Sequence, residues 1–201
     1  MKVLFATTNP AKVGKYKKAL EENGIELITI NDLDFKLDIN ENGKDALENA
    51  YIKAKAYYDI LNIPTIGMDN SLFIEELPED KQPGTYVRRV KGKELTDTEM
   101  IEYYTSLVKE YGEKLTAKWV YGMVICDGSN IEKYTWSKDH FYFVSTPSKI
   151  INEGYPLDSI SILPEFNKYF VEITDEEKKK YSKKNSNDDS VVKFILDNIK
   201  K

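Results

Sequence analysis

The chain has 201 residues, of which 41% are hydrophobic and 12% aromatic, so it can bury one sizeable core and is expected to form a single domain over residues 1–201. Its 34 Asp and Glu outnumber 29 Lys and Arg, and the formal net charge of -5 has the wrong sign for binding a nucleic acid polymer. Cys126 and His140 are the only Cys and His, which excludes a disulfide framework and a Cys/His zinc site. Any metal would be held by oxygen.

No segment approaches the roughly 18 consecutive apolar residues of a membrane span, so no membrane contact is expected. Residues 1–5 lead directly into a core strand pattern rather than a signal peptide. We therefore expect a cytoplasmic protein.

The N-terminal half of the chain alternates between strand and helix patterns. Asn9 followed by Pro10 is the order expected of a helix N-cap and a first helical residue, and Gly24 is a typical helix stop. Apolar residues at helical spacing predict a long amphipathic helix that ends near Leu61. The predicted elements are strand 2–6, helix 10–23, strand 26–30, helix 45–61 and strand 64–72.

The C-terminal half is predicted to hold three helices and a pair of strands. Thr96-Asp97-Thr98-Glu99 has the form of a capping box, and Asp127-Gly128-Ser129-Asn130 has the chemistry of a hairpin turn. The alternation of strands and helices implies a mixed sheet with helices on its faces, without an internal repeat or an interdomain linker. The predicted elements are loop 78–92, a helix from the capping box to 111, strands 118–126 and 132–144, a Gly- and Pro-rich segment 154–164, a lysine-rich helix from 175, and a last amphipathic helix with Val191, Val192, Ile195 and Ile199.

The turn after the first strand is a candidate anion site. Thr7-Thr8-Asn9-Pro10-Ala11-Lys12 brings hydroxyls, an amide and a lysine to a helix N-terminus. The helix dipole and unpaired N–H groups favour an anion there, and Lys12 adds a full charge. The pattern Gly-x-x-x-x-Gly-Lys is absent, so the turn is not a Walker P-loop. Taken alone, an ordinary capped helix with a solvated lysine explains the pattern better.

Two carboxylates are candidates for metal binding. Glu41 precedes the helix over 45–61, where it could ligate Mg²⁺ or be a solvated loop residue stabilised by the helix dipole. Asp69 comes where an apolar strand is predicted to end, which is where open α/β sheets bring their ligands. A carboxylate there can hold a metal or take a proton from water, and a simple strand-terminating turn has equal weight.

Two later segments carry further candidates. Tyr155-Pro156-Leu157-Asp158 follows Gly154 as a buried-looking turn that offers an aromatic face and a carboxylate. Residues 178–184 form a lysine run, which is usually a solvated helix face. None of these segments assigns a function alone.

Together and in this order, the segments resemble the inosine/xanthosine triphosphate pyrophosphatase family from Thr7 to Lys184. Thr7-x-Asn9-x-x-Lys12 resembles the family's opening phosphate-binding motif. The second block is the most specific part, with Glu41-x-Gly43 followed by Glu48-Asn49-Ala50 and Lys53-Ala54.

The later blocks resemble the family with several departures. Met68-Asp69-Asn70-Ser71-Leu72 falls where the family has Asp-Asp-Ser-Gly-Leu, and Pro83-Gly84-x-Tyr86 with Arg89 resembles Pro-Gly-x-Tyr-Ser-Ala-Arg. Gly154-Tyr155-Pro156-Leu157-Asp158 stands in for Gly-Phe-Gly-Tyr-Asp. Glu177-Lys178 and Ser182-Lys183-Lys184 stand in for Glu-Lys and Ser-His-Arg. The glutamate that closes the first motif is Lys15 here.

The resemblance implies an elongated α/β fold, in which a mixed twisted sheet is flanked by helical lobes with a central nucleotide cleft, usually as a homodimer. It implies Mg²⁺-dependent hydrolysis of purine nucleoside triphosphates, such as inosine and xanthosine triphosphates and their deoxy forms, to monophosphate and pyrophosphate. Glu41 and Asp69 would bind Mg²⁺, and Asp69 would be the catalytic residue that activates water. The implied substrate-binding residues are Thr7, Thr8, Asn9, Lys12 and Lys178 at the phosphates, Asn70 at the pocket wall, Tyr155 stacking on the base, and Asp158, Ser182, Lys183 and Lys184 at the base edge.

Two alternatives stay open. A catalytically inactive nucleotide-binding paralogue is favoured by Lys15, Met68 and Asn70, and opposed by the retained Glu41 and Asp69. A pyrophosphatase for a different modified nucleotide is the other alternative. An assay of several nucleoside triphosphates that scores pyrophosphate and orthophosphate separately would discriminate between them.

Overall fold

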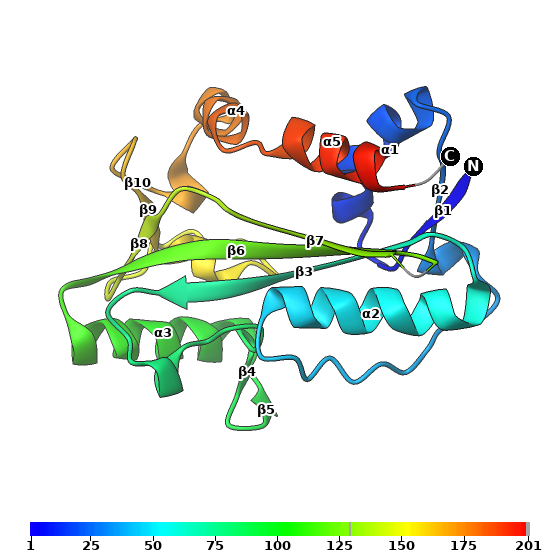
Figure 1. The fold of residues 1–201 in the computed structure, drawn as a ribbon. Coiled ribbons are helices and arrows are strands. Elements are labelled where there is room, and N and C mark those ends of the chain that lie inside the picture. Colours follow the sequence, from blue (N-terminus) through cyan, green and yellow to red (C-terminus); the bar gives the residue numbers. More distant parts are fainter. Residues whose placement is uncertain (129, 200–201) are drawn as a thin grey trace. The chain divides into compact units, whose positions relative to one another are not determined.

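The computed structural model describes residues 1–128 and 130–199 (Figure 1). The chain divides into two compact units. Unit 1 comprises Met1–Asn70, Val120–Trp136 and Asn187–Lys201, and unit 2 comprises Ser71–Trp119 and Ser137–Ser186. Two long strands, β3 (Thr65–Ile74) and β6 (Lys114–Asp127), contribute residues to both units. The single domain expected from the sequence stays a prediction.

Unit 1 is a sheet with helices on both faces. Strand β1 pairs in parallel with β2 and with β3, and β3 is followed in the sheet by β6 and then β7. Besides its parts of β3 and β6, the unit contains β1 (Lys2–Phe5), α1 (Pro10–Glu22), β2 (Glu26–Thr29), the short 3-10 helix η1 (Ile30–Asp32), α2 (Ala46–Leu61), β7 (Asn130–Ser137) and α5 (Asp188–Asn198).

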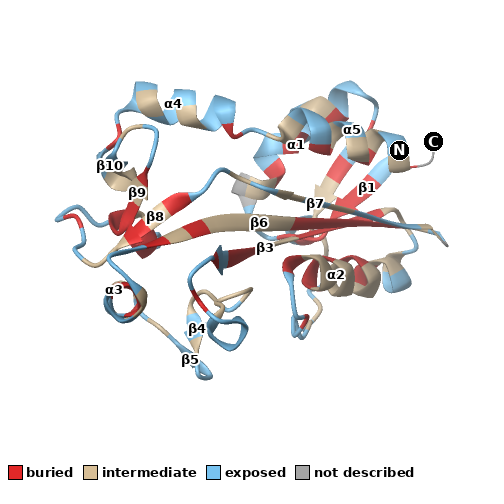
Figure 2. Cartoon of the chain, turned by 60° about the vertical axis from the view of Figure 1, so that its left-hand side comes forward, coloured by how far each residue is buried: buried red, intermediate tan, exposed pale blue. Residues whose placement is uncertain are grey.

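Alternating side chains of β1 fill two separate cores, because successive residues of a strand point to opposite faces. Val3 and Phe5 belong to a cluster with residues of α1 and α5, whereas Leu4 packs in a cluster with Tyr57 of α2. Both faces of this strand are therefore buried, as Figure 2 shows for β1. This pattern explains the continuous apolar run over residues 3–6.

Helix α2 packs closely on the sheet through glycines. A Cβ atom on Gly67 would lie 2.0 Å from the carbonyl oxygen of Ala50, and one on Gly122 would lie 2.6 Å from the Cα atom of Leu47. The helix begins after Asp45, an N-cap that the sequence analysis did not name, whose side chain accepts a hydrogen bond of 2.8 Å from the Glu48 N–H. Only glycine leaves room for the helix backbone at these two strand positions.

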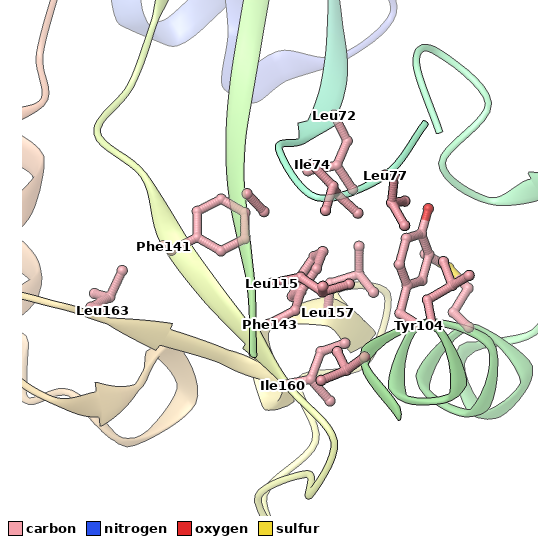
Figure 3. Close-up of a cluster of buried hydrophobic side chains, with 14 of the residues drawn as sticks. Leu72, Ile74, Leu77, Tyr104, Leu115, Phe141, Phe143, Leu157, Ile160 and Leu163 are labelled. Atoms are coloured by element: carbon pink, nitrogen blue, oxygen red, sulfur yellow. The ribbon is translucent and has the colours of Figure 1, made fainter. Parts of the chain in front are cut away.

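Unit 2 is built around an antiparallel group of strands and helix α3 (Asp97–Tyr111), which has the predicted Thr96/Glu99 capping box. Apolar side chains of β3, β6, α3 and η3 meet those of β8 in one core (Figure 3). The other elements are η2 (Glu79–Lys81), β4 (Arg89–Val90), β5 (Lys93–Glu94), β8 (Phe141–Val144), η3 (Pro156–Ser159), β9 (Ser161–Leu163), β10 (Lys168–Tyr169), η4 (Phe170–Glu172) and α4 (Asp175–Lys184). In the sheet, β6 pairs with β8, β8 with β9, and β9 with β10.

The predicted α/β class with a mixed sheet is confirmed, as are all five predicted helices, within one or two residues wherever an end was predicted. Among the described residues, no helix is both long and apolar enough to cross a membrane. The hairpin turn predicted at residues 127–130 includes Ser129, which lies outside the described residues.

The strand predicted over residues 132–144 was wrong, because the structure divides it into β7 and β8. Lys138 N–H donates to the Trp119 carbonyl oxygen at 3.2 Å, and Asp139 N–H donates to Asn185 Oδ1 at 2.9 Å. The second of these backbone donors is satisfied by a side chain instead of by the strand ladder, so the strand is interrupted there.

Three smaller expectations also need correction. The loop predicted over residues 78–92 contains η2 and, near its end, the two-residue strand β4, which pairs with β5 directly after the loop. The short strands β9 and β10 were not predicted. Asp69 does not end its strand, because β3 continues to Ile74, with Leu72 and Ile74 buried in the core of unit 2.

A pair of glycine substitutions tests the close packing of α2. Gly67→Ala should lower the free energy of unfolding by about 3 kcal/mol, because the added methyl group meets helix backbone that cannot move aside. Gly14→Ala, in open space within α1, should raise it by about 0.5–1 kcal/mol. Urea unfolding monitored by circular dichroism measures both, and equal stabilities of the two variants would contradict the packing.

Candidate active site

Hydrogen bonds of its polar groups hold the turn between β1 and α1. Thr7 is buried, and its Oγ1 accepts a hydrogen bond of 3.1 Å from the Asn9 N–H. The Asn9 carbonyl oxygen accepts from the Val13 N–H at 3.4 Å, which puts Asn9 at the predicted N-cap position of α1. The carbonyl oxygen of Thr8 accepts from the Asn31 amide at 3.3 Å. The turn therefore holds a helix N-terminus beside the carboxyl end of β1.

Lys12 reaches from α1 to strand β3. Its Nζ donates to the Met68 carbonyl oxygen at 3.4 Å and lies 4.0 Å from Asp69 Oδ1. Burial lowers the pKa of the Lys12 ammonium group, while the negative charge of Asp69 opposes this shift. The structure therefore brings together two of the residues that the sequence nominated.

A buried amide connects Asp69 to the loop that follows Glu41. Asn49 of α2 is 2% exposed; its Nδ2 donates to Asp69 Oδ2 at 3.1 Å, and its Oδ1 accepts from the Gly43 N–H at 2.8 Å. Both ends of this amide are thus used. Asn49 fixes the carboxylate and the loop to the same helix.

Glu41 forms an ion pair with Lys53 of α2, with Nζ and Oε2 2.8 Å apart. The Lys53 side chain is only 13% exposed. Lys53 and Glu41 both contribute to the pKa of Lys12, the lysine by lowering it and the glutamate by raising it. We call Lys12, Lys53, Glu41 and Asp69 the charge cluster.

A pocket of about 280 Å³ adjoins this cluster. Thr7, Thr8, Glu41 and Lys53 line it together with Tyr57, whose hydroxyl accepts from the Leu37 N–H at 3.1 Å. Its lining is mostly polar and carries charges of both signs, as a small anionic ligand with a cation requires.

The described residues supply few carboxylates for a metal. No three Asp, Glu, His or Cys among residues 1–128 and 130–199 are grouped so that they could hold an ion. Mg²⁺ is commonly bound through one or two carboxylates plus substrate phosphates and water, so Glu41 and Asp69 fit this cation as an incomplete shell.

In unit 2, the turn that carries Tyr155 and Asp158 is only partly buried. Pro156 and Leu157 are buried, and Leu157 belongs to the core of unit 2, but Tyr155 is 63% exposed, so the turn expected to be buried is buried only in part. Asp158 Oδ2 accepts from Asn152 Nδ2 at 3.2 Å, and burial raises the pKa of Asp158, against the smaller effects of this bond and of the Lys178 charge.

Helix α4 carries the remaining nominated residues. Lys178, Ser182 and Lys183 are exposed. Lys184 Nζ lies 3.1 Å from Asp139 Oδ2 and 3.6 Å from Glu165 Oε2, so two carboxylates already surround its charge. Sequence reasoning did not foresee these partners, because neither lies near Lys184 in the sequence.

Sequence reasoning also assigned no role to Asn49 or Lys53. Both stand in the second block of the motif, which is the signal that could have nominated them. Asn70 lies next to Asp69 within β3 and is partly buried.

Comparison with known proteins identifies the class to which this fold belongs. The model of the Ham1 family matches residues 3–192, and the chain belongs to this family. It is 32% identical to a dITP/XTP pyrophosphatase of Aquifex aeolicus and 30% identical to one of Bacillus subtilis, covering 90% and 89% of both chains, respectively. The Ham1 protein of Staphylococcus aureus has the same fold, with a TM-score of 0.77, 20% identity and coverage of 100% of both chains. The family resemblance predicted from the motifs is confirmed.

The electrostatics of the charge cluster predict opposite effects of two substitutions on Lys12. Asp69→Asn should lower the pKa of Lys12 further, because it removes a negative charge that favours the ammonium form. Lys15→Ala should raise this pKa, because it removes a like charge. NMR titration of the Lys12 side chain measures both shifts, and shifts of the same sign would contradict the arrangement.

Proposed function

We propose that this protein hydrolyses purine nucleoside triphosphates outside the standard set, such as inosine and xanthosine triphosphates and their deoxy forms, to the monophosphate and pyrophosphate. The charge cluster beside a strand-to-helix turn is the observation that carries this proposal. The names of the Aquifex aeolicus and Bacillus subtilis relatives, both dITP/XTP pyrophosphatases, support it. Mg²⁺ dependence and assembly as a homodimer are parts of the proposal that follow from the family resemblance.

In unit 1, the phosphate groups would lie against the turn that follows β1. Thr7, Thr8 and Asn9 would offer hydroxyl and N–H groups at the helix N-terminus, and Lys12 and Lys53 would add positive charge. Phosphate oxygens would compete with Asp69 and Glu41 for these lysines, since each lysine now faces one carboxylate. The carboxylates would then be available to a cation.

Glu41 and Asp69 would hold Mg²⁺ through their oxygens. The bound ion would supply positive charge against the phosphate oxygens and the departing pyrophosphate. Asp69 would accept a proton from the water that attacks the α-phosphorus, and the Asn49 amide at 3.1 Å would keep its carboxylate in a fixed orientation. This scheme needs no covalent intermediate.

In unit 2, we propose that Tyr155 stacks on the base and that Asp158, Ser182, Lys183 and Lys184 read its edge. The exposed ring of Tyr155 offers a face for stacking, and Asp158 is oriented by Asn152. Lys178 would contact phosphate. In unit 1, Asn70 lies next to Asp69 in β3 and is also proposed to contact the substrate.

The assay that tests the function is a panel of nucleoside triphosphates with Mg²⁺, scored for pyrophosphate and orthophosphate separately. We expect pyrophosphate from inosine and xanthosine triphosphates. Binding without any product would favour the inactive paralogue, and turnover confined to another base would favour a different modified nucleotide.

Asp69→Asn and Glu41→Gln should each reduce kcat by at least about 100-fold, because each removes a negative charge from the proposed metal site. Asp59→Asn, which changes an exposed carboxylate of α2 that pairs with Lys55, is the matched control and should keep full turnover. Circular dichroism should show that all three variants are folded. Near-normal turnover of either site variant at saturating Mg²⁺ would refute the metal assignment.

Base selectivity should favour 6-oxo purines by a modest margin. The 6-oxo group accepts hydrogen bonds from lysines, whereas the 6-amino group of adenine is a donor, but lysines fix direction less well than His and Arg. The ratio of kcat/KM for inosine over adenosine triphosphate should therefore exceed one in the wild type. It should rise further in the Lys183→His/Lys184→Arg double variant. A ratio at or below one, or no rise in the double variant, would remove these lysines from base reading.

A further inference from the structure

Gly154, which begins the turn with Tyr155 and Asp158, is held at both of its peptide groups by charged side chains. Its N–H donates to Asp97 Oδ2 at 2.7 Å, and its carbonyl oxygen accepts from Arg88 Nη2 at 3.4 Å. With φ of 79°, Gly154 has the left-handed conformation that glycine adopts without strain. These contacts come from segments more than 50 residues away in the sequence.

Arg88 and Asp97 also bind each other, and we call the pair the clamp. Arg88 Nη1 lies 2.8 Å from Asp97 Oδ1 and donates to the Leu95 carbonyl oxygen at 3.0 Å. The two side chains are 34% and 28% exposed, so they are more protected than most surface ion pairs. The hydrogen bond from Gly154, followed by that from Arg88, holds the pKa of Asp97 below its usual range.

Two features of unit 2 fix the backbone at Arg88 and Asp97. The buried Tyr104 of α3 donates its hydroxyl to the Val87 carbonyl oxygen at 3.0 Å, which fixes the backbone next to Arg88. Asp97 is the first residue of α3, directly after the N-cap Thr96. The helix and the β4–β5 hairpin therefore present the two charged groups to Gly154 from fixed positions.

The clamp holds the end of the turn that has few other side-chain contacts. Tyr155 follows Gly154 directly and is 63% exposed, so few side-chain contacts orient it. Beyond it, η3 packs on α3 and Leu157 is buried, while Asp158 N–H donates to the Tyr155 carbonyl oxygen at 3.1 Å. The turn is thus held by its core at one end and by the clamp at the other.

We propose that Arg88 and Asp97 are positioning residues that preorganise Tyr155 and Asp158 for binding the base. This inference rests on the proposed function. In the motif that this segment resembles, Pro-Gly-x-Tyr-Ser-Ala-Arg, Arg88 takes the place of the alanine, so the clamp is not part of the motif. The planar fork of Arg88 is what allows it to reach Asp97, Leu95 and Gly154 together.

Kinetics of four variants test the clamp. Arg88→Ala and Asp97→Asn should raise KM for inosine triphosphate about tenfold while kcat changes less than about twofold, because the base is held less well and the reacting groups are untouched. Arg88→Lys should recover only part of the loss. The matched control is Lys93→Ala, which breaks an ion pair with Glu99 between the same hairpin and the same helix without touching Gly154.

The rate of amide hydrogen exchange at Gly154, measured by NMR, tests the clamp without any substrate. Exchange should accelerate in Arg88→Ala and Asp97→Asn, and it should stay at the wild-type rate in Lys93→Ala. Unchanged exchange would overturn the clamp itself. Faster exchange with unchanged KM would show that the clamp is only structural, and would overturn its role in base binding.

Failure of the proposed function can be distinguished from failure of the clamp. A wild type that hydrolyses no triphosphate would refute the function, while Gly154 exchange would still report the clamp. The dissociation constant of inosine monophosphate, measured by calorimetry, would then replace KM. An affinity that is undetectable, or equal in wild type and Arg88→Ala, would overturn the positioning role as well.

Discussion

The close packing of α2 against strands β3 and β6 determines where the candidate residues of unit 1 lie. The helix can approach this closely because Gly67 and Gly122 have no side chains. At this distance Asn49 is buried, and its amide can bind both Gly43 and Asp69. Gly43 is itself tightly enclosed, since a Cβ there would lie 2.8 Å from Asn49 Oδ1. A helix placed farther from the sheet would break this connection. The packing of the core therefore also determines the geometry of the candidate site.

Burial of charged side chains near this packing costs free energy, and opposite charges within the charge cluster offset that cost. Lys12 is largely removed from water, which by itself disfavours its charged form. Glu41 and Asp69 offset this cost, as their opposing effects on the pKa of Lys12 show. Under the proposed function, these two pairs of opposite charges would exchange partners when a ligand brings both negative phosphates and a cation. A cluster of lysines alone would repel itself before the ligand arrived, and a cluster of carboxylates alone would repel the phosphates.

Local signals in the sequence predicted the helices well, because their caps and apolar spacing act over a few residues. Thr96, Asp45 and Asn9 all begin helices as expected. The errors arise where distant segments decide the structure. The break between β7 and β8 depends on Asn185, and the continuation of β3 past Asp69 depends on partners from unit 2. In the candidate site, the motifs nominated Lys12 and Asp69, but the ion pairs of Lys53 and Lys184 required the folded chain.

The two groups of proposed ligand contacts differ in how they are kept in place. Lys184 is a flexible side chain whose charge is shared between Asp139 and Glu165, so its direction is set by those carboxylates. The turn with Asp158 is instead fixed through its backbone, by Gly154 at one end and by buried Leu157 near the other. A backbone held at both ends loses less freedom when a ligand binds, and this lowers the entropic cost of ordering the site. Under the proposed function, directional recognition in unit 2 would therefore depend more on this turn than on the lysines of α4.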